Sequence, residues 1–112
     1  MKFEFPKVSL ESALASVGPG WAPLVTGVYE YIQAINPLIS VTQVKEKWGG
    51  LRIYTDNMDN RIDAAIIDAE RSSLAICEEC GHPGTLYKTS GGRYMTRCAM
   101  HGEELIFCGN PL

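Results

Sequence analysis

The segments Cys77-Glu78-Glu79-Cys80-Gly81 and Cys98-Ala99-Met100-His101 carry the strongest structural signal in this chain. Each segment places two metal-binding side chains two residues apart, a spacing at which both can reach one tetrahedral ion from a tight turn. Residues 81–97 are long enough to bring the second pair back to the first. Gly81 follows Cys80 directly, where such a turn often requires a positive φ. The sequence therefore predicts one structural zinc ion, bound by Cys77, Cys80, Cys98 and His101.

The cysteines also admit other interpretations. Disulfide bonds are disfavoured because a cytosolic chain keeps its thiols reduced and because the spacing suits a metal better. Cysteines that are buried without a metal remain the main alternative. We expect Cys108 to be an unligated thiol near the C-terminal end and His82 to be exposed. Replacement of one of the four ligands by Cys108 or His82 is the minority case.

The composition limits the possible classes of protein. The chain has 112 residues, 46% of them hydrophobic and 21% charged, which suits one domain over residues 1–112 with a single modest core. No apolar run approaches the roughly 18 residues of a membrane span, and residues 1–10 lack the apolar segment of a signal peptide. We therefore expect a cytoplasmic protein without membrane contact. The formal charge of −3 disfavours non-specific nucleic-acid binding, which needs a positive field.

The hydrophobic pattern outside the predicted zinc site indicates alternating helices and hairpins. Apolar residues from Trp21 to Ile35 recur every three or four positions, and Asn36-Pro37 ends that helix. Strand formers on both sides of Trp48-Gly49-Gly50 indicate a β-hairpin. In chain order we expect helices over residues 9–17 and 20–35, strands over 38–46 and 51–56, a helix from Asp59 or Asn60 to about Ile76, strands over 85–89 and 93–97, and a short tail from Ile106 to Leu112. The predicted fold is a small α+β domain with an antiparallel hairpin, packed helices and a zinc-ribbon-like Cys3His module over residues 77–101.

The motifs argue against catalysis. A catalytic zinc keeps an open coordination position, whereas four protein ligands close this one. The zinc deaminase signature, the Gly-rich phosphate loop and the Gly-x-Ser-x-Gly and His-Glu-x2-His motifs are absent. A similar Cys and His zinc occurs in some HNH-type nucleases, but these need further histidines and only His82 remains. We therefore expect a non-enzymatic protein, with a degenerate nuclease-like enzyme as the remote alternative.

Several segments of the chain together carry a resemblance to a known group of proteins. They are residues 43–54 (Gln-Val-Lys-Glu-Lys-Trp-Gly-Gly-Leu-Arg-Ile-Tyr), Ala69-Glu70, Ser73, residues 77–84 and the Cys98-x2-His101 pair. Over about residues 20–101 the chain resembles a family of short zinc-binding proteins from bacteria and their phages. The resemblance implies a zinc-binding domain carried by mobile elements and implies no particular reaction. By analogy, such a small acidic protein acts as a stoichiometric inhibitor or adaptor, as anti-CRISPR proteins and inhibitors of host polymerases or nucleases do.

The predicted hairpin combines cations with aromatic rings near its turn. Lys45, Lys47 and Arg52 accompany Trp48 and Tyr54, and these three cations with one glutamate give residues 45–54 a net charge of +2. In a nucleic-acid contact the cations would bind phosphates and Trp48 would stack on a base. The interpretation that we prefer from the sequence is that Trp48 packs on the core and that the cations pair with carboxylates.

The helix predicted before the zinc module carries acids beside apolar residues. Asp63 and Glu70 lie one heptad apart next to the core stripe, and Ile67 and Leu74 form a second ridge. Partly covered acids need partners, so we expect Glu70 to pair with one of the hairpin cations Lys45, Lys47 and Arg52. Alternatively, Asp63, Ile67, Glu70 and Leu74 form a partner-binding face that occupies a basic groove on a nucleic-acid enzyme. The simplest interpretation is an ordinary solvated helix face.

These observations give a ranked set of functional hypotheses. The leading one is a non-enzymatic, zinc-stabilised protein that binds a protein partner, as a phage or mobile-element inhibitor of a host system. The runner-up is a zinc-ribbon protein that binds nucleic acid through Lys45, Lys47, Trp48 and Arg52, which the net charge disfavours.

Overall fold

The computed structural model describes residues 6–109, so the predictions that concern residues 1–5 and 110–112 lie outside it. Its class is α+β with antiparallel strands, as the sequence predicts. No helix within residues 6–109 is long and apolar enough to cross a membrane. The elements are, in order, α1 (Leu10–Ala15), the 3-10 helix η1 (Pro19–Trp21), α2 (Ala22–Ile35), β1 (Val41–Lys47), β2 (Gly50–Thr55), α3 (Asn60–Ser73), β3 (Thr85–Lys88), β4 (Tyr94–Arg97) and β5 (Ile106–Gly109).

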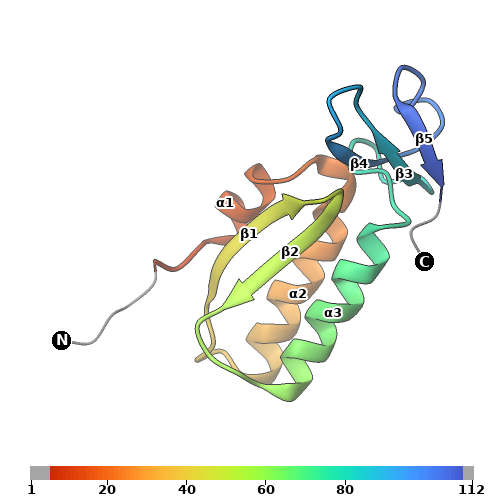
Figure 1. The fold of residues 1–112 in the computed structure, drawn as a ribbon. Helices are drawn as coiled ribbons and strands as arrows, with labels where there is room; N and C mark the ends of the chain where they lie inside the picture. Colours follow the sequence, from red (N-terminus) through yellow and green to blue (C-terminus); the bar gives the residue numbers. More distant parts are fainter. Residues whose placement is uncertain (1–5, 110–112) are drawn as a thin grey trace.

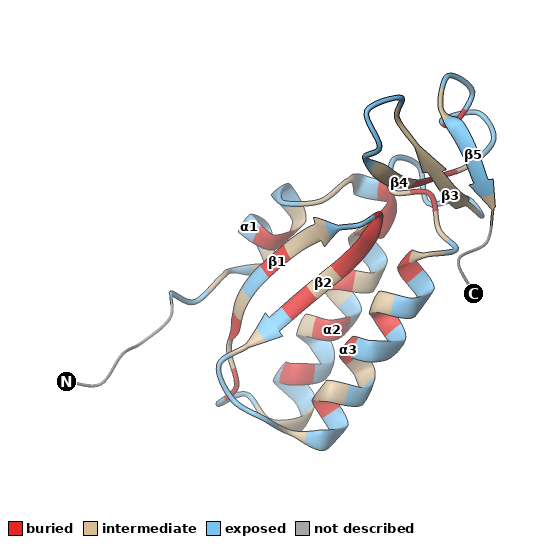
Figure 2. Ribbon diagram, in the orientation of Figure 1, coloured by how far each residue is buried: buried red, intermediate tan, exposed pale blue. Residues whose placement is uncertain are grey.

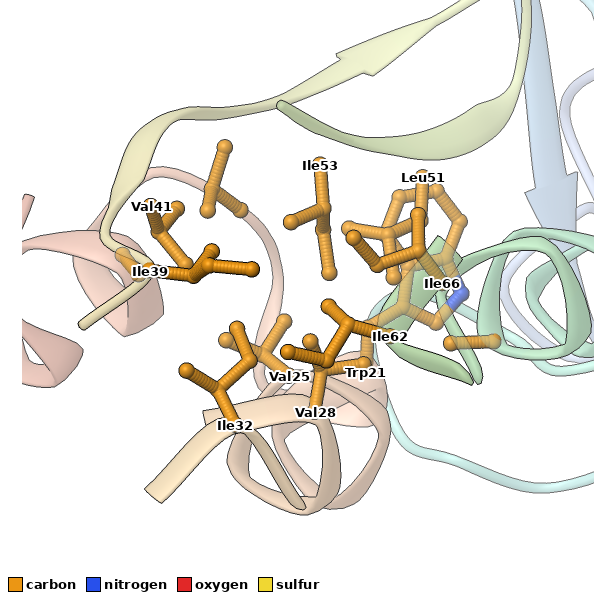
Figure 3. Packing of buried hydrophobic residues seen from close by; sticks show 13 residues of the cluster. Trp21, Val25, Val28, Ile32, Ile39, Val41, Leu51, Ile53, Ile62 and Ile66 are labelled. Atoms are coloured by element: carbon orange, nitrogen blue, oxygen red, sulfur yellow. The ribbon is translucent and has the colours of Figure 1, made fainter. Parts of the chain in front are cut away.

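The main core lies between the β1–β2 hairpin and the helices α2 and α3 (Figures 1 and 3). One face of the hairpin turns Val44, Leu51 and Ile53 toward the helices, while α2 and α3 turn their apolar stripes toward the hairpin. The largest fully buried side chain is Trp21, whose indole N–H donates to the carbonyl oxygen of Ile76. Within residues 6–109 no layer covers the opposite face of the hairpin, and its residues are exposed or half-buried (Figure 2).

Local capping explains where the helices begin and end. The Ser9 side chain accepts from the backbone N–H of Ser12 at the start of α1, and Asp59 accepts from two backbone N–H groups at the start of α3. Helix α3 ends at Ser73 rather than at Ile76 because the next three residues form 3-10-type turns, in which Ile76 N–H donates to the Ser73 carbonyl.

The open edge of β2 is closed by side chains of α3. The sheet has only β1 and β2 as strands, and the N–H groups of Leu51 and Ile53 lie on the edge of β2 that faces away from β1. Ser73 Oγ accepts from Leu51 N at 2.9 Å, and Glu70 Oε2 accepts from Ile53 N at 3.0 Å. The predicted ion pair between Glu70 and a hairpin cation is therefore wrong: within the described residues the Glu70 carboxylate caps a strand edge and takes part in no ion pair.

The C-terminal strands form a second sheet at the turn end of the hairpin (Figure 1). Its order is β4-β3-β5, with antiparallel neighbours throughout. The sequence prediction gave the β3–β4 hairpin but treated the residues from Ile106 to Leu112 as a short tail. Instead, β5 pairs with β3, and the Phe107 ring packs edge-on against Tyr87 with centroids 5.6 Å apart.

Candidate metal centre

Four side chains from two turns converge at one point. Cys77 and Cys80 lie in the turn between α3 and β3, and Cys98 and His101 lie in the turn after β4. Their ligand atoms all lie within 4.8 Å of one another. The sequence prediction that these four residues come together is confirmed, and the cysteines form no disulfide.

The distances within this Cys3His cluster suit a tetrahedral ion. Cys80 Sγ and Cys98 Sγ are 3.7 Å apart, and His101 Nδ1 lies 3.5 Å from Cys77 Sγ and 3.2 Å from Cys98 Sγ. With metal–sulfur bonds of about 2.3 Å and metal–nitrogen bonds of about 2.0 Å, the edges of a tetrahedron are about 3.8 Å between sulfurs and about 3.5 Å between sulfur and nitrogen. The four residues can therefore hold one metal ion with little movement.

Each pair of ligands is presented by a hydrogen-bonded turn. The N–H of Gly81 donates to the carbonyl oxygen of Cys77 at 2.9 Å, and Gly81 has a φ of +82°, as predicted for this position. In the second turn, the N–H of Gly102 donates to the carbonyl oxygen of Cys98 at 2.8 Å. The two turns have matching hydrogen bonds, so both pairs of ligands are fixed by the backbone.

Backbone N–H groups favour the thiolate at two of the three cysteines. Burial raises the pKa of Cys77, but hydrogen bonds from the backbone of Cys98 and Cys80 outweigh burial, so this pKa is lowered. The backbone N–H of His101 lowers the pKa of Cys98. The N–H of His82 acts in the same direction on Cys80, but desolvation and the neighbouring thiols raise the pKa of Cys80 overall. A bound cation would resolve this competition, because a metal holds all of its thiol ligands deprotonated.

The two spare residues lie where the sequence predicts them. His82 is exposed, and its Nδ1 lies 3.2 Å from Cys80 Sγ, beside the cluster rather than within it. Cys108 is exposed on β5, and its Sγ contacts the carbonyl oxygen of Ile106 on the same strand. Neither belongs to the group of four.

Glu78, between the two cysteines of the first turn, fastens the cluster to the helical part of the chain. Its carbonyl oxygen accepts from Gly20 N at 2.7 Å, and its Oε2 accepts from Gly18 N at 3.0 Å. Its Oε1 lies 3.3 Å from Arg97 Nη1, and the Arg97 side chain is only 10% exposed. Because Arg97 directly precedes Cys98, this buried ion pair connects both ligand turns with the loop before α2.

The proposed α3 face is only partly free. Ile67 is 47% exposed, whereas Asp63 is half-buried. Leu74 is half-buried beside Gly50, and the carboxylate of Glu70 already accepts from Ile53 N–H. Two of the four residues therefore have a structural role within the fold.

The hairpin residues differ from the sequence expectation, although Arg52 and Lys45 are half-buried and Arg52 Nη1 donates to the carbonyl oxygen of Leu51 at 3.1 Å. Trp48 is 66% exposed, so the prediction that it packs on the core is wrong. Within residues 6–109, none of the ion pairs includes Lys45, Lys47 or Arg52, so the predicted pairing with carboxylates is wrong as well. The reason is the docking of the turn. Gly49 faces the second sheet, where its carbonyl oxygen accepts from Thr96 Oγ1 at 2.6 Å, and this arrangement leaves the Trp48 side chain outside.

Sequence reasoning missed the ring that lies beside Trp48. Tyr94 on β4 approaches the Trp48 ring to 6.4 Å between centroids, and Arg93 forms an exposed ion pair with Glu46 at 3.5 Å. No local pattern could have revealed these contacts, because the two segments are more than 40 residues apart. No family model, curated protein or solved structure matches the chain in comparisons of its sequence and fold.

Proposed function

We propose that this chain is a non-enzymatic protein that carries one structural zinc ion and acts by binding a macromolecular partner. The donor set supports zinc, because three thiolates and one imidazole in a tetrahedron are a preferred zinc environment. Four protein ligands leave no coordination position for a substrate or an activated water. The zinc ion would then supply folding free energy rather than chemistry.

The observation that carries this proposal is the position of the cluster in the fold. Its two turns join the end of α3, strand β4 and, through Glu78, the loop before α2. Within residues 6–109 no other group of His, Cys, Asp and Glu side chains is close enough to hold a metal. A metal that ties these segments together organises a surface, and function then resides in what that surface binds.

The resemblance to short zinc-binding proteins of bacteria and their phages supports the kind of role that we propose. A protein of this type would act stoichiometrically, as an inhibitor or adaptor directed at a host system in the bacterial cytoplasm. One contact surface for a protein partner is centred on the exposed Ile67 and includes Asp63 and Glu70 of α3 and Leu74, which directly follows the helix. The β1–β2 hairpin offers a second contact surface. Among the described residues its cations Lys45, Lys47 and Arg52 take part in no ion pair.

Metal analysis tests the first part of this proposal. The purified protein should contain about one zinc per chain, and the Cys80→Ser variant should lose the zinc and much of its stability. The matched control is Cys108→Ser, which changes an exposed thiol outside the cluster and should leave the metal content unchanged. Less than about 0.2 zinc per chain after mild purification would contradict a structural zinc site.

Cobalt substitution tests whether the site is closed. Co²⁺ takes the same tetrahedral ligands, and its visible spectrum responds to any added ligand that enters the coordination shell. We expect azide to leave the spectrum of the Co²⁺ protein unchanged, because four protein ligands fill the shell. A spectrum that shifts with azide would indicate an open position and would favour a catalytic site over a structural one.

A further inference from the structure

The outer face of the β1–β2 hairpin concentrates cations that the fold does not neutralise. We define the hairpin face as Gln43, Lys45, Lys47, Arg52 and Tyr54, which alternate with the core-facing residues of the two strands. Lys45 lies directly opposite Arg52 in the antiparallel register. Like charges in this position destabilise a sheet. A pair of this kind, with no carboxylate partner among the described residues, points to an external anion.

Trp48, at the end of this face, is held in a conformation that costs stability. It has a φ of +57°, the only positive φ of a non-glycine residue within residues 6–109, and such values are unfavourable for a bulky side chain. Burial does not compensate for the cost, because the side chain is 66% exposed. The turn is nevertheless fixed, since Glu46 Oε2 accepts from Gly49 N at 2.8 Å. An exposed, strained and well-positioned indole is typical of a binding residue.

Aromatic rings and cations alternate along the whole face. Tyr54 is 42% exposed, with Lys45 Nζ 5.8 Å from its ring centroid. At the other end the Trp48 ring neighbours Tyr94. Interleaved rings and cations are the combination that binds single-stranded nucleic acids, because the rings stack on bases while the cations follow the phosphates.

We propose that the hairpin face, with Trp48 at its end, binds a single-stranded nucleic acid. This inference names the macromolecular partner of the proposed function and rests on it. A duplex is disfavoured on geometric grounds. A two-stranded ribbon can enter a major groove about 12 Å wide, but this ribbon has α2 and α3 packed on its back and its turn docked against Thr96. The accessible face of the hairpin instead suits a single nucleic-acid strand, because its bases are unpaired and can stack on the exposed rings.

The net charge of the chain does not oppose this contact. Although the whole chain has a formal charge of −3, residues 45–54 carry three cations and one glutamate, a local charge of +2. At physiological ionic strength, interactions between exposed charges are largely screened beyond about 8 Å. Helix α3, which carries Asp63 and Asp68, lies in the layer behind the hairpin (Figure 1), whereas the Glu70 carboxylate reaches the edge of β2 and accepts from Ile53 N. The charges that the hairpin itself presents to a bound phosphate are therefore net positive.

Fluorescence anisotropy with the zinc-loaded full chain tests the proposal. The probes are labelled oligonucleotides of about 12 nucleotides: single-stranded DNA, single-stranded RNA and the matching DNA duplex, with polyglutamate as an acidic polypeptide competitor. We expect micromolar binding of a single strand at about 50 mM salt, with a slope of log K against log salt near −2 if three cations contact phosphates. Whether DNA or RNA binds more tightly identifies the sugar that the face prefers.

The variants separate binding from folding. Trp48→Gly removes the indole and the backbone strain together, so the protein should remain folded while affinity falls by about 5- to 150-fold. Lys47→Ala should weaken binding and reduce the salt slope by about 0.7. The matched control is Arg71→Ala, which removes an exposed cation from α3 and should leave affinity unchanged.

Several results would overturn the inference. These are no binding at about 50 mM salt, equal affinity for the duplex, equal effects of Lys47→Ala and Arg71→Ala, or displacement by polyglutamate as efficient as by unlabelled oligonucleotide. Cross-linking in a bacterial lysate, with and without nuclease, distinguishes the two levels of the proposal. A specific protein partner that resists nuclease, without oligonucleotide binding, would refute the hairpin inference and leave the proposed function standing. The absence of both would refute both.

Discussion

Replacing Gly20 with alanine should weaken the junction between the metal centre and the helices. Gly20 lies in η1, where its N–H donates to the carbonyl oxygen of Glu78 at 2.7 Å. A Cβ at this position would overlap the carbonyl oxygen of Cys77 and lie 2.5 Å from the amide nitrogen of Gly81. All of these atoms belong to the backbone of the first ligand turn, so no side-chain rotation can relieve the overlap.

The size of the effect follows from the contact. Overpacking a tight site usually costs about 1–3 kcal/mol, and a site bounded by backbone atoms belongs at or above the upper end. A loss of about 3 kcal/mol is a large part of the roughly 5–15 kcal/mol that stabilises an ordinary domain. For a chain of this length it corresponds to a fall in Tm of roughly 12 °C. Displacement of the turn that holds Cys77 and Cys80 should also make the metal easier to remove.

Gly27 provides a control with the same substitution. It lies within α2, and a Cβ there would meet no atom within 4 Å. Gly27→Ala should therefore raise stability by about 0.5–1 kcal/mol, because alanine favours the helix more than glycine does. Thermal unfolding followed by circular dichroism, together with the rate of metal transfer to a chelator, measures both variants. If Gly20→Ala unfolds at the wild-type temperature and retains its metal equally well, the close contact between η1 and the ligand turn is refuted.

Two further predictions concern α3. Ser73→Ala removes the buried hydroxyl that accepts from Leu51 N, so the free energy of unfolding measured in urea should fall by about 1–3 kcal/mol. Ser72→Ala changes an exposed position and should lower it hardly at all. Equal effects of the two variants would contradict the edge-capping role of Ser73. Hydrogen bonding from the Arg61 side chain lowers the pKa of Asp59 to about 2, from 3.8. Because the folded-state pKa is the lower one, this carboxylate stabilises the fold above about pH 4, and the benefit is lost as the pH falls toward 2. Asp59→Asn should therefore differ most from the wild type near neutral pH and converge with it near pH 2; a difference that does not change with pH would refute this assignment.

The parts of the structure that could be predicted from the sequence are those that local chemistry determines. Cys77, Cys80, Cys98 and His101 form a recognisable pattern because a tetrahedral ion requires particular donors at short spacing. The end of α2 at Ile35 follows from Asn36-Pro37, since the residue before proline avoids helical backbone angles. In both cases the physical cause lies within a few residues of its effect.

Contacts between distant segments could not be predicted in the same way. The partner of Glu70 depends on the two-stranded sheet, which leaves the N–H of Ile53 exposed at an edge beside α3. A carboxylate near three cations suggested an ion pair. In the fold, however, this carboxylate accepts from a backbone N–H that would otherwise lack a partner. Likewise, β5 pairs with β3 and places Phe107 opposite Tyr87, a contact that the short apolar run alone does not reveal.

The exposure of Trp48 links the metal centre to the hairpin face. From sequence alone, a tryptophan in a small protein is expected to contribute to the core, and Trp21 does so. Trp48 instead lies on the outside because the turn is held by the second sheet, through Thr96 Oγ1 to Gly49 O and through Arg93 to Glu46. Thr96 lies on β4, and Arg93 directly precedes that strand. At its other end β4 continues into the ligand turn of Cys98. The proposed zinc ion and the proposed nucleic-acid contact are therefore connected by one short strand.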